Sequence, residues 1–282
     1  MTIDRRDYGG FVLCSVAGIT VIVPLVWMIL ALAQSGLPGL EWEFLVAAPS
    51  QSGRAGGIGP MIVSTALILG VCLAAIIPVG LGTSLYLSQY VSSTSPQASW
   101  LGYSLDVLAG TPSIVFALFG YQFFAITLGL GFSILAGGLT LACMTLPLMV
   151  RTSEQALRAV PLELHQAGEA LALSRPGMIW HVLLPAAMPG IVAGTILSIG
   201  RALAETAVLL FTAGYVMRLP GSLLDSGRAL SVHIFDMAMN VPGGMPVASR
   251  TALVLLTLVI LINIGVRRML LHHKRIYYEQ TN

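Results

Sequence analysis

Six apolar runs, each long enough to cross a lipid bilayer, constrain this chain more than any other feature. A helix that spans the hydrocarbon core needs about 20 mainly apolar residues. In hydrocarbon every backbone polar group must be satisfied within the segment, so we expect these runs to be helices. The sequence therefore predicts an all-α, polytopic membrane protein with six transmembrane helices in a single domain over residues 1–282. The runs are Phe11–Ala33, Met61–Tyr90, Leu105–Leu130, Phe132–Val150, Leu183–Gly214 and Ala248–Val266.

The composition excludes a water-soluble protein. Only 9% of the 282 residues are charged and 56% are hydrophobic, with a mean hydropathy of +0.87, whereas roughly a quarter of the residues in a soluble domain are charged. The net charge of +2 is too small to indicate a nucleic-acid partner. The cysteines Cys14, Cys72 and Cys143 lie in apolar runs without metal-binding spacing, so we expect neither disulfides nor a bound metal.

The first apolar run follows charged residues, as a secretory signal does, but it is too long to be one. Phe11–Ala33 has 23 residues, whereas the apolar part of a signal peptide has about 7–15. We therefore expect a retained transmembrane helix.

The distribution of Lys and Arg predicts the orientation, because cytoplasmic segments are enriched in these residues. If the N-terminus is cytoplasmic, nine of the 14 basic residues lie inside and four outside, with Arg201 within the membrane. Both termini and the polar segment Arg151–Gly177 are then expected on the cytoplasmic side. The inside residues are Arg5, Arg6, Arg151, Arg158, Arg175, Arg267, Arg268, Lys274 and Arg275, and the outside residues are Arg54, Arg218, Arg228 and Arg250.

The other connections differ in length. Gly129 and Gly131 flank a tight reversal between the third and fourth runs. Outside, Gln34–Pro60 is rich in Gly and Pro and is predicted to be a loop, whereas Met217–Pro246 contains apolar residues that could form a short helix at the outer surface. Proline inside a helix removes a backbone donor and kinks it, and of four prolines within the runs Pro112 is the best candidate for a functional break.

The polar segment Arg151–Gly177 is predicted to contain a short helix. Pro161 suits the first helical position and Glu163 suits the positive end of the helix dipole. We expect the helix to cover Leu162–Leu173, where Ser174–Gly177 ends it. An amphipathic connector and a docking element are both compatible with this pattern.

The fifth run carries two charges, although a charge at the bilayer centre costs about 2.5–3.5 kcal/mol on insertion scales. Arg201 and Glu205 are four residues apart, so on a continuous helix they share one face and partly neutralise each other. That face would also include Ser198 and Thr212. It predicts either an ion pair that fixes helix packing or a pathway wall in which Arg201 meets an anion. Arg151 and Glu154 form a similar pair at the inner end of the fourth run.

The polar segment resembles the coupling loop of ABC importer permeases, whose pattern is E-A-A-x3-G-x9-I-x-L-P. The spacing fits throughout, and the departures are Gln166 for the acid, Gly168 for the second alanine, Ala172 for the glycine and Val182 for isoleucine. In such permeases the loop docks onto an ATP-hydrolysing subunit, which implies a docking role for Glu163, Gln166, Ala167, Gly168, Ala172, Leu184 and Pro185.

Five further stretches, in order, are similar to phosphate importer permeases of the PstA type. The resemblance covers Leu105 to about Asp236. The stretches are Leu108–Phe116, Arg151–Glu154, Leu157–Pro161, Arg201–Ala213 and Ala229–Phe235.

This resemblance implies a MetI-like permease core with a cytoplasmic coupling helix (loop 151–182) in the inner membrane of a bacterium. The chain would form half of a phosphate path lined by Ser198, Arg201, Glu205, Thr212, Arg151 and Glu154. The implied partners are a homologous permease subunit (PstC type), two cytoplasmic ATPase subunits (PstB type), a phosphate-binding protein (PstS type) and membrane lipid. The sequence has no G-x4-G-K-[ST] loop, so we expect no cofactor on this chain, no enzymatic activity of its own, and ATP used by the partners.

Three alternatives remain open. A permease for another oxyanion, such as sulfate or molybdate, would have the same fold. A secondary transporter would act alone and usually has internal repeats, none of which is found. An intramembrane enzyme is disfavoured because the five histidines form no H-E-x-x-H pattern and all are expected in loops or at interfaces.

Overall fold

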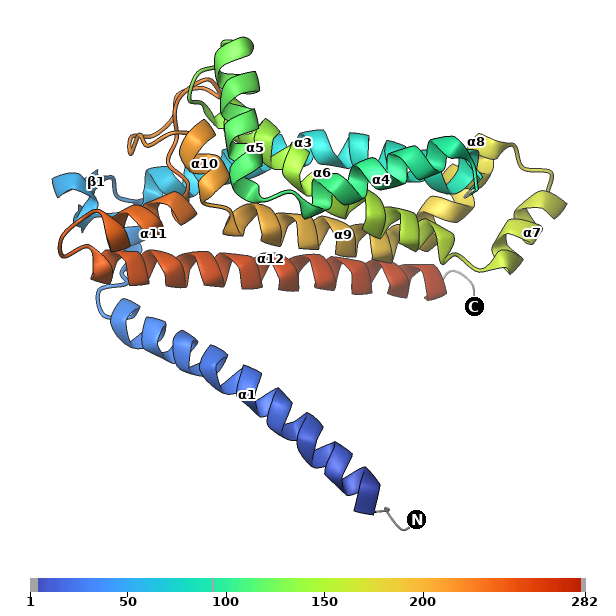
Figure 1. The fold of residues 1–282 in the computed structure, drawn as a ribbon, viewed down its shortest axis with the longest axis horizontal. Coiled ribbons are helices and arrows are strands. Elements are labelled where there is room, and N and C mark those ends of the chain that lie inside the picture. Colours follow the sequence, from blue (N-terminus) through green and yellow to red (C-terminus); the bar gives the residue numbers. More distant parts are fainter. Residues whose placement is uncertain (1–4, 93, 280–282) are drawn as a thin grey trace.

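Long helices running roughly along one axis form the body of the protein (Figure 1). The structure, a computed structural model, describes residues 5–92 and 94–279. Five helical segments in this part of the chain are long and apolar enough to cross a membrane, and a sixth is a bent pair. The prediction of an all-α membrane protein is confirmed. The long helices are α1 (Arg5–Gly36), α3 (Gly59–Leu85), α6 (Ile134–Arg158), α9 (Leu184–Ala204) and α12 (Met245–Glu279).

The third predicted span is bent rather than continuous. Helix α4 (Pro96–Gly110) ends before Thr111, and α5 (Ser113–Gly120) continues as the π-helical turn η3 (Tyr121–Thr127) at 99° to it. Figure 1 shows α5 standing across the direction of the long helices. The break lies at Pro112, the predicted candidate, because proline disfavours helical torsions at the residue before it, and Thr111 is extended with ψ 130°.

The fifth predicted span is also interrupted. The helical segment begins at Arg175, as α8 (Arg175–Met178) and the π-helical turn η4 (Ile179–Leu183), and α9 then ends at Ala204. Glu205 is extended, with ψ 129°, and a short helix α10 (Ala207–Thr212) follows. No proline or glycine lies at this break. Instead, the Ser231 hydroxyl donates a hydrogen bond of 2.7 Å to the carbonyl oxygen of Glu205, so a tertiary contact replaces the helical one.

Helix α6 lies at the centre and packs against α3 and α9. A Cβ atom at Gly190 would collide with Ala156, and one at Gly194 with Thr152, so these glycines allow α6 and α9 to approach closely. Further out, Gly137 of α6 lies against Ala213 and Leu209, which belong to the segment after the break. Helices α6 and α9 therefore run antiparallel, with Ala156 opposite Gly190 and Thr152 opposite Gly194.

A separate short helix, α7 (Leu162–Ala170), lies at one end of the bundle. We call this end the inner end and the opposite end the outer end (Figure 1). The first described residues of α1 and the last of α12 also lie toward the inner end. Helix α7 begins at the predicted Leu162, with Pro161 as its N-cap residue, and it ends at Ala170, three residues before the predicted end at Leu173. The Ser174 hydroxyl accepts a hydrogen bond from the Gly177 N–H and caps α8.

The outer end is more ordered than expected. The predicted loop Gln34–Pro60 contains α2 (Trp42–Val46) and a small hairpin of β1 (Pro49–Ser50), η1 (Gln51–Gly53) and β2 (Ala55–Gly56). The expected short helix is present as α11 (Leu230–Met239), but Leu230, Val232 and Met237 are fully buried. Helix α11 therefore lies at the outer surface with one face buried in the core, whereas Phe235 and Met239 on its other face are exposed.

The tight reversal between the third and fourth spans is confirmed. Gly129 and Gly131 have φ values of +69° and +61°, which side chains rarely adopt. Their backbone N–H groups donate to the carbonyl oxygens of Ile126 and Ala125. This turn brings the chain directly from η3 to the outer end of α6.

Candidate functional site

Arg201 lies near the middle of the bundle, on the last turn of α9. Gly194 faces Thr152 and Leu209 faces Gly137, so the antiparallel register places Arg201 level with Thr145, near the midpoint of α6. The side chain of Arg201 is exposed on the surface of this chain, and Glu205, one turn later, is half-buried. Within residues 5–92 and 94–279, Arg201 has no carboxylate within ion-pairing distance.

The break after Ala204 changes the face predicted for this span. Arg201 and Glu205 remain one helical turn apart, but Thr212 belongs to a separate helix, so the single stripe from Ser198 to Thr212 does not exist. Both hydroxyl groups are fully buried: Ser198 donates to the carbonyl of Gly194 and Thr212 to that of Val208. In this conformation they contribute to the packing of the wall, whereas Arg201 and Glu205 are accessible.

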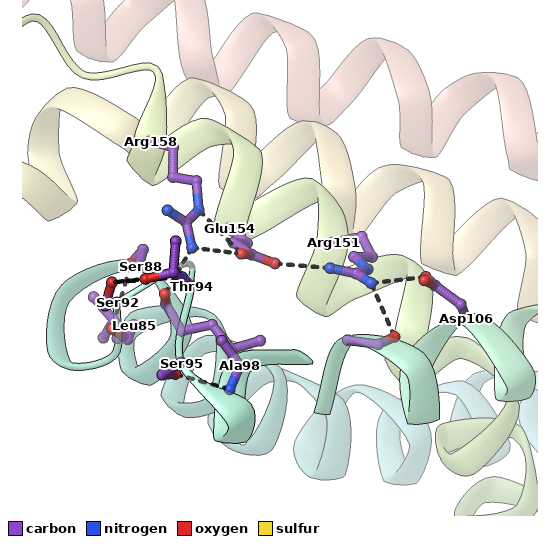
Figure 2. A network of polar contacts seen from close by, with 12 residues as sticks. Leu85, Ser88, Ser92, Thr94, Ser95, Ala98, Asp106, Arg151, Glu154 and Arg158 are labelled. Atoms are coloured by element: carbon purple, nitrogen blue, oxygen red, sulfur yellow. Dashed lines mark hydrogen bonds and ion pairs between the residues drawn. The ribbon is translucent and has the colours of Figure 1, made fainter. Parts of the chain in front are cut away.

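Arg151 and Glu154 belong to an ionic network that joins α6 to α4 (Figure 2). Arg151 Nη2 lies 2.7 Å from Asp106 Oδ1 and donates to the carbonyl of Gly102 at 2.9 Å. Arg151 Nη1 lies 3.3 Å from Glu154 Oε2. Glu154 is 9% exposed and also binds Arg158, whose Nη2 lies 3.0 Å from Glu154 Oε1. This pair therefore makes structural contacts between helices, in contrast to the unpaired Arg201.

The residues expected to contact an ATPase fall into two groups. Glu163, Gln166 and Ala167 are exposed on α7. Gly168 is buried against the end of the Met178 side chain, where a Cβ atom would collide. Leu184 is buried in the core, whereas Pro185 is exposed. Only the first group, with Pro185 and Ala172, presents side chains that a partner could touch.

Ala172 gives a physical reason for the glycine at the corresponding position of the family pattern. Its φ is +51°, in the left-handed region, where a residue with a Cβ atom costs roughly 1–2 kcal/mol. Leu171 and Ala172 form the turn that reverses the chain from α7 toward α8. Glycine adopts this conformation without that cost.

A buried ion pair lies at the outer end. Arg228 Nη1 lies 2.8 Å from Asp236 Oδ2, and the Arg228 guanidinium carbon lies 4.9 Å from the centre of the Tyr215 ring. Next to them, the ring nitrogens of His233 have no hydrogen-bond partner, and burial, with the charge of Arg228, lowers its pKa to about 4. His233 is fully buried, so the expectation that all histidines lie in loops or at interfaces is wrong.

Sequence reasoning missed Asp106, Arg228 and Asp236 as functional side chains. A signal existed for Asp106, because an acidic residue within an apolar run needs a partner. However, Asp106 lies 45 residues from Arg151, and only the folded arrangement of α4 and α6 identifies that partner.

Known proteins resemble this chain along most of its length. The family model of binding-protein-dependent transport system inner membrane components matches residues 76–273. The probable ABC transporter permease protein YqgI of Bacillus subtilis is 31% identical over 279 residues, which cover 94% of each chain. The phosphate transport system permease protein PstA of Xylella fastidiosa is 31% identical and covers 86% of this chain and 85% of its own length. The phosphate transport system permease protein PstA 2 of Mycobacterium bovis is 36% identical over 208 residues, which cover 73% of this chain and 67% of its own length.

A solved structure agrees at the level of the fold. The inward-facing MetNI methionine ABC transporter has a chain that superposes with a TM-score of 0.60 at 18% sequence identity, covering 77% of this chain and 95% of its own. The bent span, the central α6 and the projecting α7 thus belong to an ABC permease fold, in which Arg201 at mid-depth has no ion-pair partner among the residues that the structure describes. The chain belongs to the family of binding-protein-dependent transport system inner membrane components.

Proposed function

We propose that this chain is the permease subunit of an ATP-driven importer of inorganic phosphate and forms half of the translocation path. Relatives at 31–36% identity that are named phosphate transport system permeases support the substrate. The observation that carries the proposal is Arg201, an arginine level with the midpoint of α6 and without an ion-pair partner in the described chain. A charge at mid-depth in a membrane is costly unless it serves a ligand or a partner.

Arg201 would bind the phosphate anion as it passes. A guanidinium presents planar N–H donors that match two phosphate oxygens, and its positive charge offsets the loss of hydration. Glu205, one turn further out, would attract Arg201 when the path is empty and so keep the anion from being held too tightly. Ser198 and Thr212 support the wall behind these residues.

The partners follow from this role. A homologous permease of the PstC type would form the other half of the path, and a binding protein of the PstS type would deliver phosphate at the outer end. Two ATPase subunits of the PstB type would bind on the cytoplasmic side, where Glu163, Gln166 and Ala167 of α7 would provide docking contacts for an ATPase subunit. The chain itself would bind no cofactor and catalyse no reaction. The inner end, with α7 and both termini, would face the cytoplasm, as the nine basic residues there favour.

Reconstitution of the complex in liposomes tests this function. With the ATPase subunits and binding protein present, ATP hydrolysis and uptake of radiolabelled anion should both increase with phosphate and remain unchanged with sulfate or molybdate. Stimulation by sulfate or molybdate instead of phosphate would show that the substrate is another oxyanion, and uptake without ATP would favour a secondary transporter.

A further inference from the structure

Helix α4 packs on the rest of the molecule through one narrow apolar face. Leu105 is its only buried residue and meets Leu87 and Val150; Ala98 and Leu101, which are not buried, pack against the same cluster, and Leu108 packs against the central core. Trp100 and Tyr103 are about 70% exposed. A helix with so small a buried face needs other contacts to fix its position relative to α6.

Arg151 provides those contacts at two points of α4. One nitrogen, Nη2, donates both to the Gly102 carbonyl at 2.9 Å and to Asp106 Oδ1 at 2.7 Å. Gly102 and Asp106 are one helical turn apart, so a single planar guanidinium fixes both the height and the rotation of α4 (Figure 2). Glu154 holds the other nitrogen, Nη1, at 3.3 Å and so fixes the guanidinium itself.

The same carboxylate links this contact to the inner end of α6. Glu154 Oε1 accepts from Arg158 Nε at 3.0 Å, and Arg158 Nη2 donates to the carbonyl of Leu87 at 2.8 Å. Arg158 is the last residue of α6, and α7 begins at Leu162. The end of α6 next to α7 therefore contacts both the connection between α3 and α4, at Leu87, and α4 itself, at Gly102 and Asp106.

The other end of α4 leads toward Arg201. The chain bends by 99° at Thr111 and Pro112, and α5 then packs against α10. Helix α10 begins two residues after Glu205. The elements α7, α6, α4, α5 and α10 are thus linked in series, by chain connections from α7 to α6 and from α4 to α5 and by packing from α6 to α4 and from α5 to α10, and the series ends two residues after Glu205.

We propose that Asp106 and Arg151 are positioning residues for transport, which make α4 move together with the end of α6 that carries α7. This inference rests on the proposed function and adds how the motion of an ATPase reaches the path. The network transmits displacement and does not touch phosphate. Its loss should therefore leave ATP hydrolysis intact and uncouple it from uptake.

Uptake per ATP hydrolysed tests this role in the reconstituted complex. Asp106→Asn should lower phosphate uptake by up to about fivefold, because it removes the charge of a partly exposed ion pair, which is worth up to about 1 kcal/mol, with ATP hydrolysis within about twofold of wild type. Asp106→Glu, which keeps the carboxylate, should recover most of the uptake. Glu41→Gln, a change to an exposed carboxylate at the outer end, is the matched control and should behave like wild type. Equal uptake per ATP in Asp106→Asn and Glu41→Gln would overturn the proposal.

Hydrogen exchange of the α4 amides gives a second test that needs no transport. In wild type, exchange in Pro96–Gly110 should differ between the nucleotide-free complex and the complex trapped with an ATP analogue, and Asp106→Asn should abolish this difference. Wild-type exchange that does not respond to nucleotide would refute the positioning role. Failure of phosphate uptake in wild type, with the exchange response present, would instead refute the proposed substrate and leave the coupling supported.

Discussion

Replacing Gly194 by alanine should separate the two central helices. A Cβ atom at this position would lie 2.9 Å from the Cβ of Thr152 and closer still to its Oγ1, whereas carbon atoms in contact prefer about 3.5–4.0 Å. The Thr152 hydroxyl donates to the carbonyl of Leu148 at 2.7 Å, which holds its rotamer. Neither side chain can move away freely, so α9 has to shift from α6.

The change in the free energy of unfolding follows from two opposing effects. Overpacking of this kind costs about 1–3 kcal/mol, and replacing glycine by alanine within a helix stabilises it by about 0.5–1 kcal/mol. The net loss for Gly194→Ala is thus about 1–2 kcal/mol. At Gly200, on the same helix, an added Cβ atom meets nothing within 4 Å. Gly200→Ala therefore keeps only the favourable effect.

Heating the purified permease with a thiol-reactive dye measures the difference. Cys72 is fully buried and reacts only on unfolding, whereas Cys14 is exposed and sets the baseline. For a chain of this size, each kcal/mol of unfolding free energy shifts the midpoint of thermal unfolding by about 2–4 °C. Gly194→Ala should therefore lower the midpoint by about 4 °C, and Gly200→Ala should raise it by about 2 °C. Equal midpoints for the two variants would refute the close approach of α6 and α9.

Two other predictions concern the ends of the bundle. Ala172→Gly should stabilise the turn after α7 by about 1 kcal/mol, because it removes the strain of φ +51°, and slower proteolysis at Leu171–Ser174 would show it; unchanged or faster cleavage would contradict it. His233 should make the protein less stable in acid: its pKa of about 4 lies below the ordinary 6.5, so stability is complete above pH 6.5 and falls between pH 6.5 and 4, by about 2 kcal/mol at pH 5. The unfolding midpoint of His233→Phe should therefore fall less between pH 7 and 5 than that of wild type.

The sequence identified the spans because apolar length is a direct consequence of the bilayer, but it indicated only one of the two interruptions inside them. The bend at Pro112 has a local cause, and the proline marks it. The break after Ala204 has none, because its residues are compatible with a helix and the hydroxyl that stabilises the break comes from Ser231, 26 residues later. Interruptions caused by tertiary contacts are invisible to patterns of hydropathy.

The candidate site was predictable to a similar extent. Charges in apolar runs are costly and therefore conspicuous, so Arg201, Glu205, Arg151 and Glu154 stood out. Which of them are paired depends on the neighbouring helix: α4 brings Asp106 to Arg151, whereas no described helix brings a carboxylate to Arg201. Spacing along one helix cannot distinguish a structural arginine from one that is available to an anion.

Phosphate uptake by the Arg201→Gln variant tests the central claim most directly. The substitution keeps a polar side chain but shortens it and removes its charge, and losing one donor that stabilises an anion costs about a hundredfold or more in rate. We predict that uptake falls at least that much while the ATPase subunits still copurify with the chain. Uptake at the wild-type rate in a correctly assembled complex would contradict the assignment of Arg201 to the phosphate path.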